Sequence, residues 1–221
     1  MKKKIITIFI VALLASCASI AYCITADEAL NLLKDGNIRF VKMEMQHPND
    51  KAERRKDTAT AGQKPFAAVL ACSDSRGPVE MIFDRGIGDI FVIRVAGNIA
   101  MDKSVIGSAE YAVGHLGCPI LVVMGHTECG AVKAAVSGPP LTGDIRDIQK
   151  KIEPVAEKVK REYPYLKGPE LTTAVVKSNV LQTKADILSH SGEIKDMADE
   201  GRLKIVTAIY DIKTGIVDWF E

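Results

Sequence analysis

An apolar run that ends in metal-binding residue types constrains this chain more than any other feature. Residues Phe66–Ala71 are almost continuously apolar and predict a buried strand, and Cys72, Asp74 and Arg76 follow it directly. Open α/β sheets place their ligands at the carboxyl ends of strands. An arginine can hold a carboxylate by a forked pair of hydrogen bonds. This stretch therefore predicts a functional site at a strand end.

A second apolar run ends in the same way. Ile120–Met124 predicts another strand, and His126 and Cys129 follow it with two residues between them. That spacing lets both side chains reach one metal ion, and zinc prefers thiolate and imidazole ligands. We therefore expect one Zn²⁺ per chain at the carboxyl edge of a parallel sheet, bound by Cys72, His126 and Cys129. Either Asp74 or water would complete the coordination.

Three motifs give the chain a specific resemblance. They are Cys-Ser-Asp-Ser-Arg at Cys72–Arg76, Phe-Val-Ile-Arg-Val-Ala-Gly-Asn at Phe91–Asn98 and His-Thr-Glu-Cys-Gly at His126–Gly130. With them the chain resembles the β-class carbonic anhydrases, from about Asp27 to the C-terminus. The first and last motifs together are highly specific, whereas either one alone is weak.

The resemblance implies a zinc lyase that hydrates carbon dioxide reversibly to bicarbonate and a proton, with zinc-bound hydroxide as the nucleophile. Asp74 would accept a hydrogen bond from that hydroxide, and Arg76 would keep Asp74 ionised and in place. Hydrolysis of carbonyl sulfide or carbon disulfide at the same site is an alternative, as is a non-catalytic zinc- or bicarbonate-binding envelope protein. A purely structural zinc is disfavoured, because structural sites use four Cys or His ligands.

β-class relatives differ in whether the aspartate reaches the metal. In one group it becomes the fourth ligand in a closed form, which a bicarbonate pocket favours. That pocket uses a tryptophan three residues before the first cysteine and a glycine just before it. Here those positions hold Val69 and Ala71, and the single tryptophan is Trp219. The chain is therefore similar to the plant-type, open-site branch, and we expect Asp74 to stay paired with Arg76.

The resemblance also implies a substrate pocket with apolar walls and one hydrogen-bond donor. Its members would be Gln63, Phe91, Ala96, Tyr111 and Gly130. Gln63 would donate its amide to the substrate oxygen. In plant-type relatives Gln63, Phe91 and Tyr111 serve across a dimer interface, which predicts a homodimer or a dimer of dimers. The simpler interpretations are core aromatics at Phe91 and Tyr111 and a loop-capping role for Gln63.

The order of apolar runs predicts an α/β fold. Strands are expected at 66–71, 90–94, 120–124, 204–210 and 216–220, and helices after Thr25 and over 104–116, 145–159, 171–189 and 194–199. Their alternation predicts a mostly parallel central sheet flanked by helices, with an antiparallel edge strand. Pro154 predicts a kink or a break in its helix. The N-terminal helix, which begins with a capping box at Thr25–Glu28, is compatible with packing on a partner subunit or on its own core.

Residues 1–23 have the pattern of an export leader, followed by a single domain over 24–221. Lys2–Lys4 precede the apolar run Ile5–Ala15, which is too short to span a bilayer comfortably. Leu14–Cys17 resembles a bacterial lipobox, which predicts cleavage before Cys17, a lipid on Cys17 and export to the periplasm or cell envelope. An ordinary secretory cleavage after Ala21 is the alternative. Membrane contact is expected only through the lipid anchor.

Composition limits the number of domains and the kinds of partner that we expect. The chain has 221 residues, 47% of them hydrophobic, which suffices for one α/β domain. Its formal net charge of +1 gives no reason to expect nucleic acid as a partner. Cys118, outside both motifs, is expected to be a small buried hydrophobe. His115 would either carry protons or simply end its helix.

Overall fold

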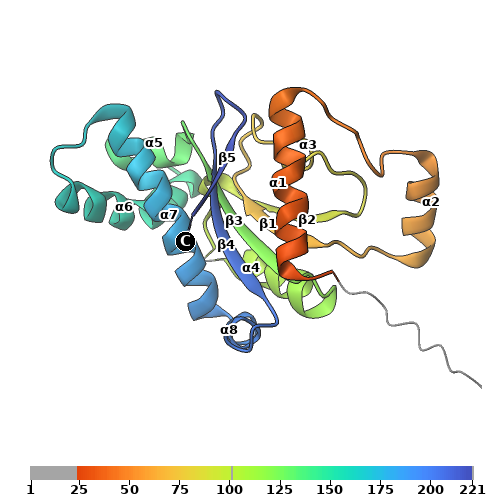
Figure 1. Ribbon diagram of the computed structural model, residues 1–221. Coiled ribbons are helices and arrows are strands. Elements are labelled where there is room, and N and C mark those ends of the chain that lie inside the picture. The colour runs from red at the N-terminus through yellow and green to blue at the C-terminus, as the bar shows by residue number, and fades with distance from the viewer. Residues whose placement is uncertain (1–23, 101, 221) are drawn as a thin grey trace, which may run out of the picture.

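The computed structural model describes residues 24–100 and 102–220, and they form an α/β fold (Figure 1). Five strands make one sheet in the order β2-β1-β3-β4-β5. Their bounds are β1 Ala67–Ala71, β2 Ile90–Arg94, β3 Ile120–His126, β4 Lys204–Tyr210 and β5 Val217–Phe220. The first four strands run parallel, and β5 is antiparallel to β4. The predicted mostly parallel sheet with an antiparallel edge strand is confirmed.

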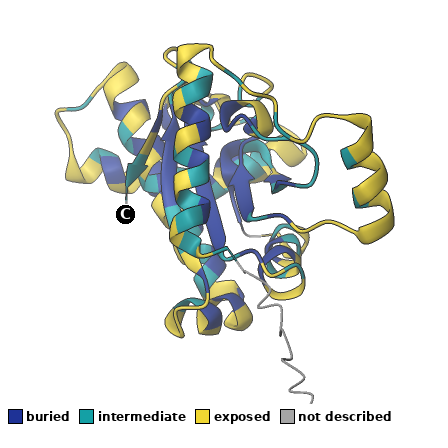
Figure 2. Cartoon of the chain, turned by 45° about the vertical axis from the view of Figure 1, so that its right-hand side comes forward, coloured by how far each residue is buried: buried dark blue, intermediate teal, exposed yellow. Residues whose placement is uncertain are grey.

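Helices cover both faces of the sheet, so β1 and β3 are buried along their whole length. One face carries α1 (Ala26–Lys42) and α3 (Val79–Ile82), and the other carries α4 (Lys103–Glu110), η2 (Tyr111–His115), α7 (Gly168–His190) and α8 (Gly192–Asp199). The remaining elements are α2 (Ala52–Ala61), η1 (Ala96–Asn98), α5 (Gly130–Ser137) and α6 (Asp144–Glu162). Figure 2 shows the buried sheet between them, while α2 projects from the body and is exposed.

The chain changes direction across the sheet between β1 and β3. The connection from β1 to β2 passes through α3 on one face, and the connection from β2 to β3 passes through α4 on the other. Neighbouring strands with connections on opposite faces leave a crevice at their carboxyl ends, where α/β proteins bind ligands. Cys72 follows β1 and His126 ends β3, so both motifs meet at this crevice.

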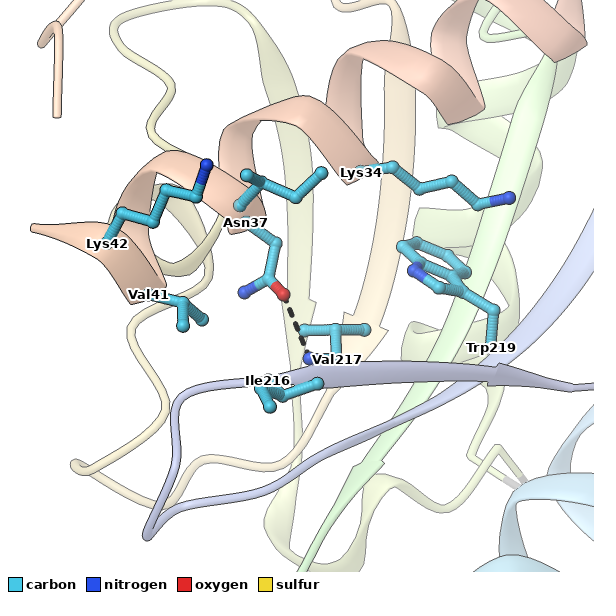
Figure 3. A pocket seen from close by; sticks show the side chains of 8 residues that line it. Lys34, Asn37, Val41, Lys42, Ile216, Val217 and Trp219 are labelled. Carbon is cyan, nitrogen blue, oxygen red and sulfur yellow. Dashed lines mark hydrogen bonds between the residues drawn. The ribbon is translucent and has the colours of Figure 1, made fainter. Parts of the chain in front are cut away.

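Helix α1 packs on the sheet of its own chain, one of the two arrangements left open by the sequence. Gly36 permits the close approach, because a Cβ there would lie 1.8 Å from the Phe83 carbonyl oxygen. The buried Asn37 side chain donates to the Gly215 carbonyl at 2.8 Å. It also accepts from the Val217 amide at 2.9 Å (Figure 3). The groove between α1 and β5 in Figure 3 has a volume of about 410 Å³ and contains none of the predicted site residues.

Two helices differ in detail from the prediction. The helix expected over 104–116 is α4 followed by the π-helical turn η2. The break expected at Pro154 is wrong, because α6 runs through that residue. Pro154 is exposed, whereas Ile152 and Ala156 are buried against the core. The carbonyl that proline leaves without a helical partner can therefore bond to water while the apolar face keeps the helix in place.

The predicted leader, including Cys17, lies outside the described residues. Within the described ranges, the helices lack the combination of length and apolar character that a bilayer span requires. Cleavage before Cys17 and lipid attachment there therefore stay predictions.

Candidate metal centre

The structure brings Cys72, His126 and Cys129 together in a buried cluster. Their potential ligand atoms all lie within 4.8 Å of one another. Cys72 stands just beyond β1, His126 is the last residue of β3, and Cys129 caps the N-terminus of α5. The parallel pairing of β1 with β3 aligns their carboxyl ends, and this alignment unites two motifs that are over fifty residues apart.

The imidazole of His126 is oriented as a metal ligand would be. Its Nδ1 lies 2.9 Å from the Thr127 carbonyl oxygen, which can only accept, so the ring proton belongs on Nδ1. Nε2 then carries the lone pair that could bind a metal ion. Nε2 is buried and has no hydrogen-bond partner. Unpartnered buried polar atoms are rare in native proteins, and a cation between the three side chains would satisfy this one.

The two thiols are electrostatically coupled. Hydrogen bonding from Cys129 lowers the pKa of Cys72 below its usual range, although burial opposes the shift. The same bond, together with burial, raises the pKa of Cys129 well above its usual range. The pair therefore favours one thiolate and one thiol, which together hold one proton. A divalent cation can replace that proton, and two thiolates with one neutral imidazole are a donor set that zinc accepts.

Asp74 is held beside this cluster by Arg76. The guanidinium Nε donates to Asp74 Oδ1 at 2.9 Å, and Nη2 donates to Oδ2 at 2.7 Å. The hydrogen bond from Arg76 outweighs partial burial and holds the pKa of Asp74 well below its usual range. Asp74 Oδ2 lies 3.9 Å from His126 Nε2. An ionised carboxylate therefore faces the position that a metal would occupy, and the predicted Asp74–Arg76 pair is present.

Arg94 fixes the loop that carries Cys72 and Asp74, a role that sequence reasoning missed. Its Nε donates to the Cys72 carbonyl at 3.0 Å, and its Nη2 donates to the Asp74 carbonyl at 2.6 Å. Arg94 ends β2, which pairs with β1 in parallel register. A charged residue that closes an apolar strand was the available signal.

The predicted pocket residue Ala96 adjoins the cluster through its neighbour Gly97. The backbone N–H of Gly97 donates to Cys72 Sγ at 3.3 Å in a buried setting. Gly130 begins α5 directly after Cys129. The backbone amides of Val132 and Ala131 point towards the Cys129 thiol and offset part of the rise in its pKa. Both predicted residues therefore lie next to metal-ligand candidates.

The other three predicted pocket residues lie together, but away from the metal cluster of their own chain. Gln63 and Tyr111 line one surface hollow, and the Phe91 ring lies 5.9 Å from that of Tyr111. Gln63 precedes β1, whereas Cys72 follows it. Five residues at about 3.3 Å each place them on the order of 16 Å or more apart. One chain alone therefore does not bring Gln63 to its own metal ligands.

Cys118 and His115 both lie outside the metal cluster. Cys118 is buried, its Sγ lies 3.4 Å from the Pro65 carbonyl oxygen, and burial raises its pKa to about 12. It is therefore a small buried hydrophobe, as predicted. His115 is exposed at the end of η2, where its ring stacks on Tyr111 at 4.7 Å.

The chain is similar in sequence to proteins that are named as carbonic anhydrases. A family model described as carbonic anhydrase matches residues 67–217. Carbonic anhydrase 2 of Mycobacterium tuberculosis is 38% identical over 191 residues, which are 85% of this chain and 89% of that protein. A carbonic anhydrase of Mycolicibacterium smegmatis is 47% identical over 130 residues, 57% of this chain and 62% of that protein.

Solved structures share the fold. One of two tetrameric β-carbonic anhydrases of Sordaria macrospora superposes with a TM-score of 0.71 and 26% identity, covering 76% of this chain and 87% of that one. The β-carbonic anhydrase CafA of Aspergillus fumigatus superposes with a TM-score of 0.71 and 25% identity. The match covers 88% of this chain and 90% of that one. Together with the cysteine–histidine cluster at the crevice, these likenesses show that the chain belongs to the β-class carbonic anhydrase family of enzymes.

Proposed function

We propose that this protein hydrates carbon dioxide reversibly to bicarbonate and a proton at a single zinc site in each chain. The observation that carries the proposal is the buried cluster of Cys72, His126 and Cys129 with the ionised Asp74 beside it. The three residues fit zinc in ligand type, in mutual distance and in the unpartnered His126 Nε2. A structural zinc site would not need the adjacent Asp74–Arg76 pair.

Zinc, when bound, lowers the pKa of water and so supplies a nucleophile near neutral pH. The side chains of Asp74 and Arg76 would orient that nucleophile. Asp74 is ionised and can only accept, so it would accept a hydrogen bond from the nucleophile and thereby orient a lone pair of that oxygen towards the carbon of the substrate. Arg76 holds both oxygens of Asp74 in plane by its fork. The Arg76 Nη2 bond to the Glu128 carbonyl, at 3.2 Å, connects this pair to the motif His126–Gly130.

The substrate pocket is completed by a second copy of the chain. Gln63, Phe91 and Tyr111 gather at the opposite end of β1 from Cys72, so the metal site that they would serve is that of a partner. Helix α2 lines the same hollow and has no buried residue in the single chain (Figure 2). A short helix without a buried face has little tertiary stabilisation of its own, and a partner would supply it.

Export is the second part of the proposal. The basic start, the apolar run and the small residues before Cys17 support cleavage at that cysteine and a lipid anchor in the bacterial envelope. The three cysteines described outside that leader form no disulfide. This suits a metal site in which two of them serve as thiolates.

Stopped-flow measurement of carbon dioxide hydration tests the activity directly. The zinc-loaded protein should accelerate hydration, removal of zinc by a chelator should abolish the acceleration, and added Zn²⁺ should restore it. The same preparation is then assayed with carbonyl sulfide and carbon disulfide. A protein that hydrolyses either gas but leaves carbon dioxide hydration at the uncatalysed rate would overturn the proposal in favour of the alternative substrate.

A further inference from the structure

The geometry points to Asn179 on α7 as a positioning residue that, through Gly97, keeps a backbone hydrogen bond on the metal-ligand candidate Cys72. The inference rests on the proposed zinc ligands and adds a residue that acts on one of them through an intervening backbone group. Asn179 lies outside all three motifs and touches none of the ligands itself.

Two buried hydrogen bonds connect these residues. The Nδ2 of Asn179 donates to the Gly97 carbonyl at 2.9 Å, and the Gly97 N–H donates to Cys72 Sγ at 3.3 Å. Asn179 is 3% exposed, so its amide cannot exchange this bond for one to bulk water. Gly97 therefore has both of its backbone polar groups engaged, one with the helix and one with the sulfur.

Gly97 needs this restraint because of its backbone conformation. Its φ of +72° lies in the left-handed region, where glycine alone is unstrained. A side chain there would be strained by this φ, and Ile152 of α6 would have to shift, because a Cβ would lie 2.8 Å from Ile152 Cδ1. Glycine is also the residue with the most backbone freedom. The contact with Asn179 selects the one conformation that aims the Gly97 N–H at the sulfur.

The position of α7 places Asn179 within reach of Gly97. Gly125 lies in β3, directly before His126, and a Cβ there would lie 2.6 Å from Val180 Cγ2 and 3.1 Å from Val176 Cγ1. The absence of a side chain lets α7 pack close to the carboxyl end of β3. Both valines are buried, so the contact is an apolar one that fixes the helix. The same packing sets Asn179 above the turn at Gly97.

An N–H bond to a ligand sulfur changes what that sulfur offers a metal. The hydrogen bond stabilises negative charge on the Cys72 sulfur and holds the sulfur in place, which favours retention of a bound cation; it also lowers the energy of the sulfur lone pairs. Substitution of residues that support metal ligands by hydrogen bonds typically lowers metal affinity or activity by about 10- to 100-fold. Because Asn179 acts through a backbone group, we expect its removal to have an effect at the lower end of this range, with zinc lost about 10-fold faster.

The test compares Asn179→Leu with Thr183→Val. Leucine has a similar size to asparagine but donates nothing. Thr183 is a buried polar residue one turn further along α7, 1% exposed, and serves as the matched control. Two quantities are measured on metal-loaded protein: the rate of zinc transfer to a chelator, and the thiolate-to-metal charge-transfer band after substitution with Co²⁺. Asn179→Leu should release zinc about 10-fold faster and move the band to longer wavelength, while Thr183→Val leaves both unchanged.

Asn179→Ser removes the same amide with less bulk and decides the question if the leucine variant does not fold. The inference is overturned if folded Asn179 variants keep the wild-type release rate and band, or if Thr183→Val changes both equally. Wild-type protein that binds no stoichiometric zinc would overturn the ligand assignment instead, so the two failures are distinguishable.

Discussion

Arg76 holds Asp74 through two parallel hydrogen bonds, from Nε to Oδ1 at 2.9 Å and from Nη2 to Oδ2 at 2.7 Å. Charge-assisted forks of this kind combine strength with a fixed geometry. Arg76→Ala should free the carboxylate to turn towards the metal and compete for the fourth position. We expect hydration activity to fall by about 100-fold, a size usual for loss of a positioned acid–base partner, while zinc content stays at one per chain.

Two further variants separate geometry from charge at this position. Arg76→Lys keeps a cation but cannot form the fork, so it should recover only part of the activity. Arg202→Ala removes an exposed arginine that is paired with Glu200, and it should behave as wild type. Full activity of Arg76→Ala at full zinc occupancy would contradict the proposed role of the pair.

The metal assignment predicts loss of zinc from ligand variants. Cys72→Ser and His126→Ala should each lose most of the bound zinc and the activity with it, because two remaining ligands do not hold the ion. Cys118→Ser is the control, since Cys118 is buried outside the cluster. Zinc content by atomic absorption and hydration rate are measured on the same samples. Normal zinc and turnover in both ligand variants would refute the site.

The proposed shared pocket predicts complementation between two inactive chains. Gln63→Ala keeps its metal ligands but lacks the amide, whereas His126→Ala keeps the amide but lacks zinc. In a mixed dimer one site combines intact ligands from the first chain with intact Gln63 from the second. Refolding an equal mixture should therefore raise the activity above the mean of the two variants. Activity equal to that mean would place Gln63 in the site of its own chain or outside any site.

Burial of Cys118 predicts a specific pH dependence of stability. Its pKa is about 12 in the folded chain, against about 8.5 for a free thiol. The folded state therefore keeps a proton that the unfolded state loses, so this contribution is complete below about pH 8.5 and declines as pH rises towards the folded value. The slope is at most about 1.4 kcal/mol per pH unit.

Cys118→Ala should remove that slope. Its free energy of unfolding should be lower than wild type near neutral pH, because a cavity remains, but should fall less steeply in alkali. Urea unfolding at about pH 8 and about pH 10.5 measures the difference. Parallel stability curves for the two proteins would show that Cys118 titrates normally.

The leader predicts a modified N-terminus in the natural host. Mass spectrometry of the mature protein should find Cys17 as the first residue, with lipid attached. An unmodified N-terminus after Ala21 would remove the anchor but keep export, and retention of Met1 would defeat both. Cys17→Ala should yield no lipidated form.

The sequence alone determined the fold class and the composition of the metal cluster. Strands were recognisable at Phe66–Ala71 and Ile120–Met124 because buried parallel strands are continuously apolar. Their ligands follow each strand within a few residues, and parallel pairing brings strand ends together. The Asp74–Arg76 pair is equally local, with its partners two residues apart. Each of these features is encoded in contiguous residues.

Only the tertiary structure decided the surroundings of that cluster. Asn179 and Gly97 are 82 residues apart and Asn37 and Val217 are 180 apart, and neither pair follows any periodicity. Whether α1 packs on its own sheet depends on close approaches such as that at Gly36, which arise only once helices and sheet are assembled. Glycine and asparagine are common residue types, so their roles become visible only when packing has brought distant backbone groups within hydrogen-bond reach.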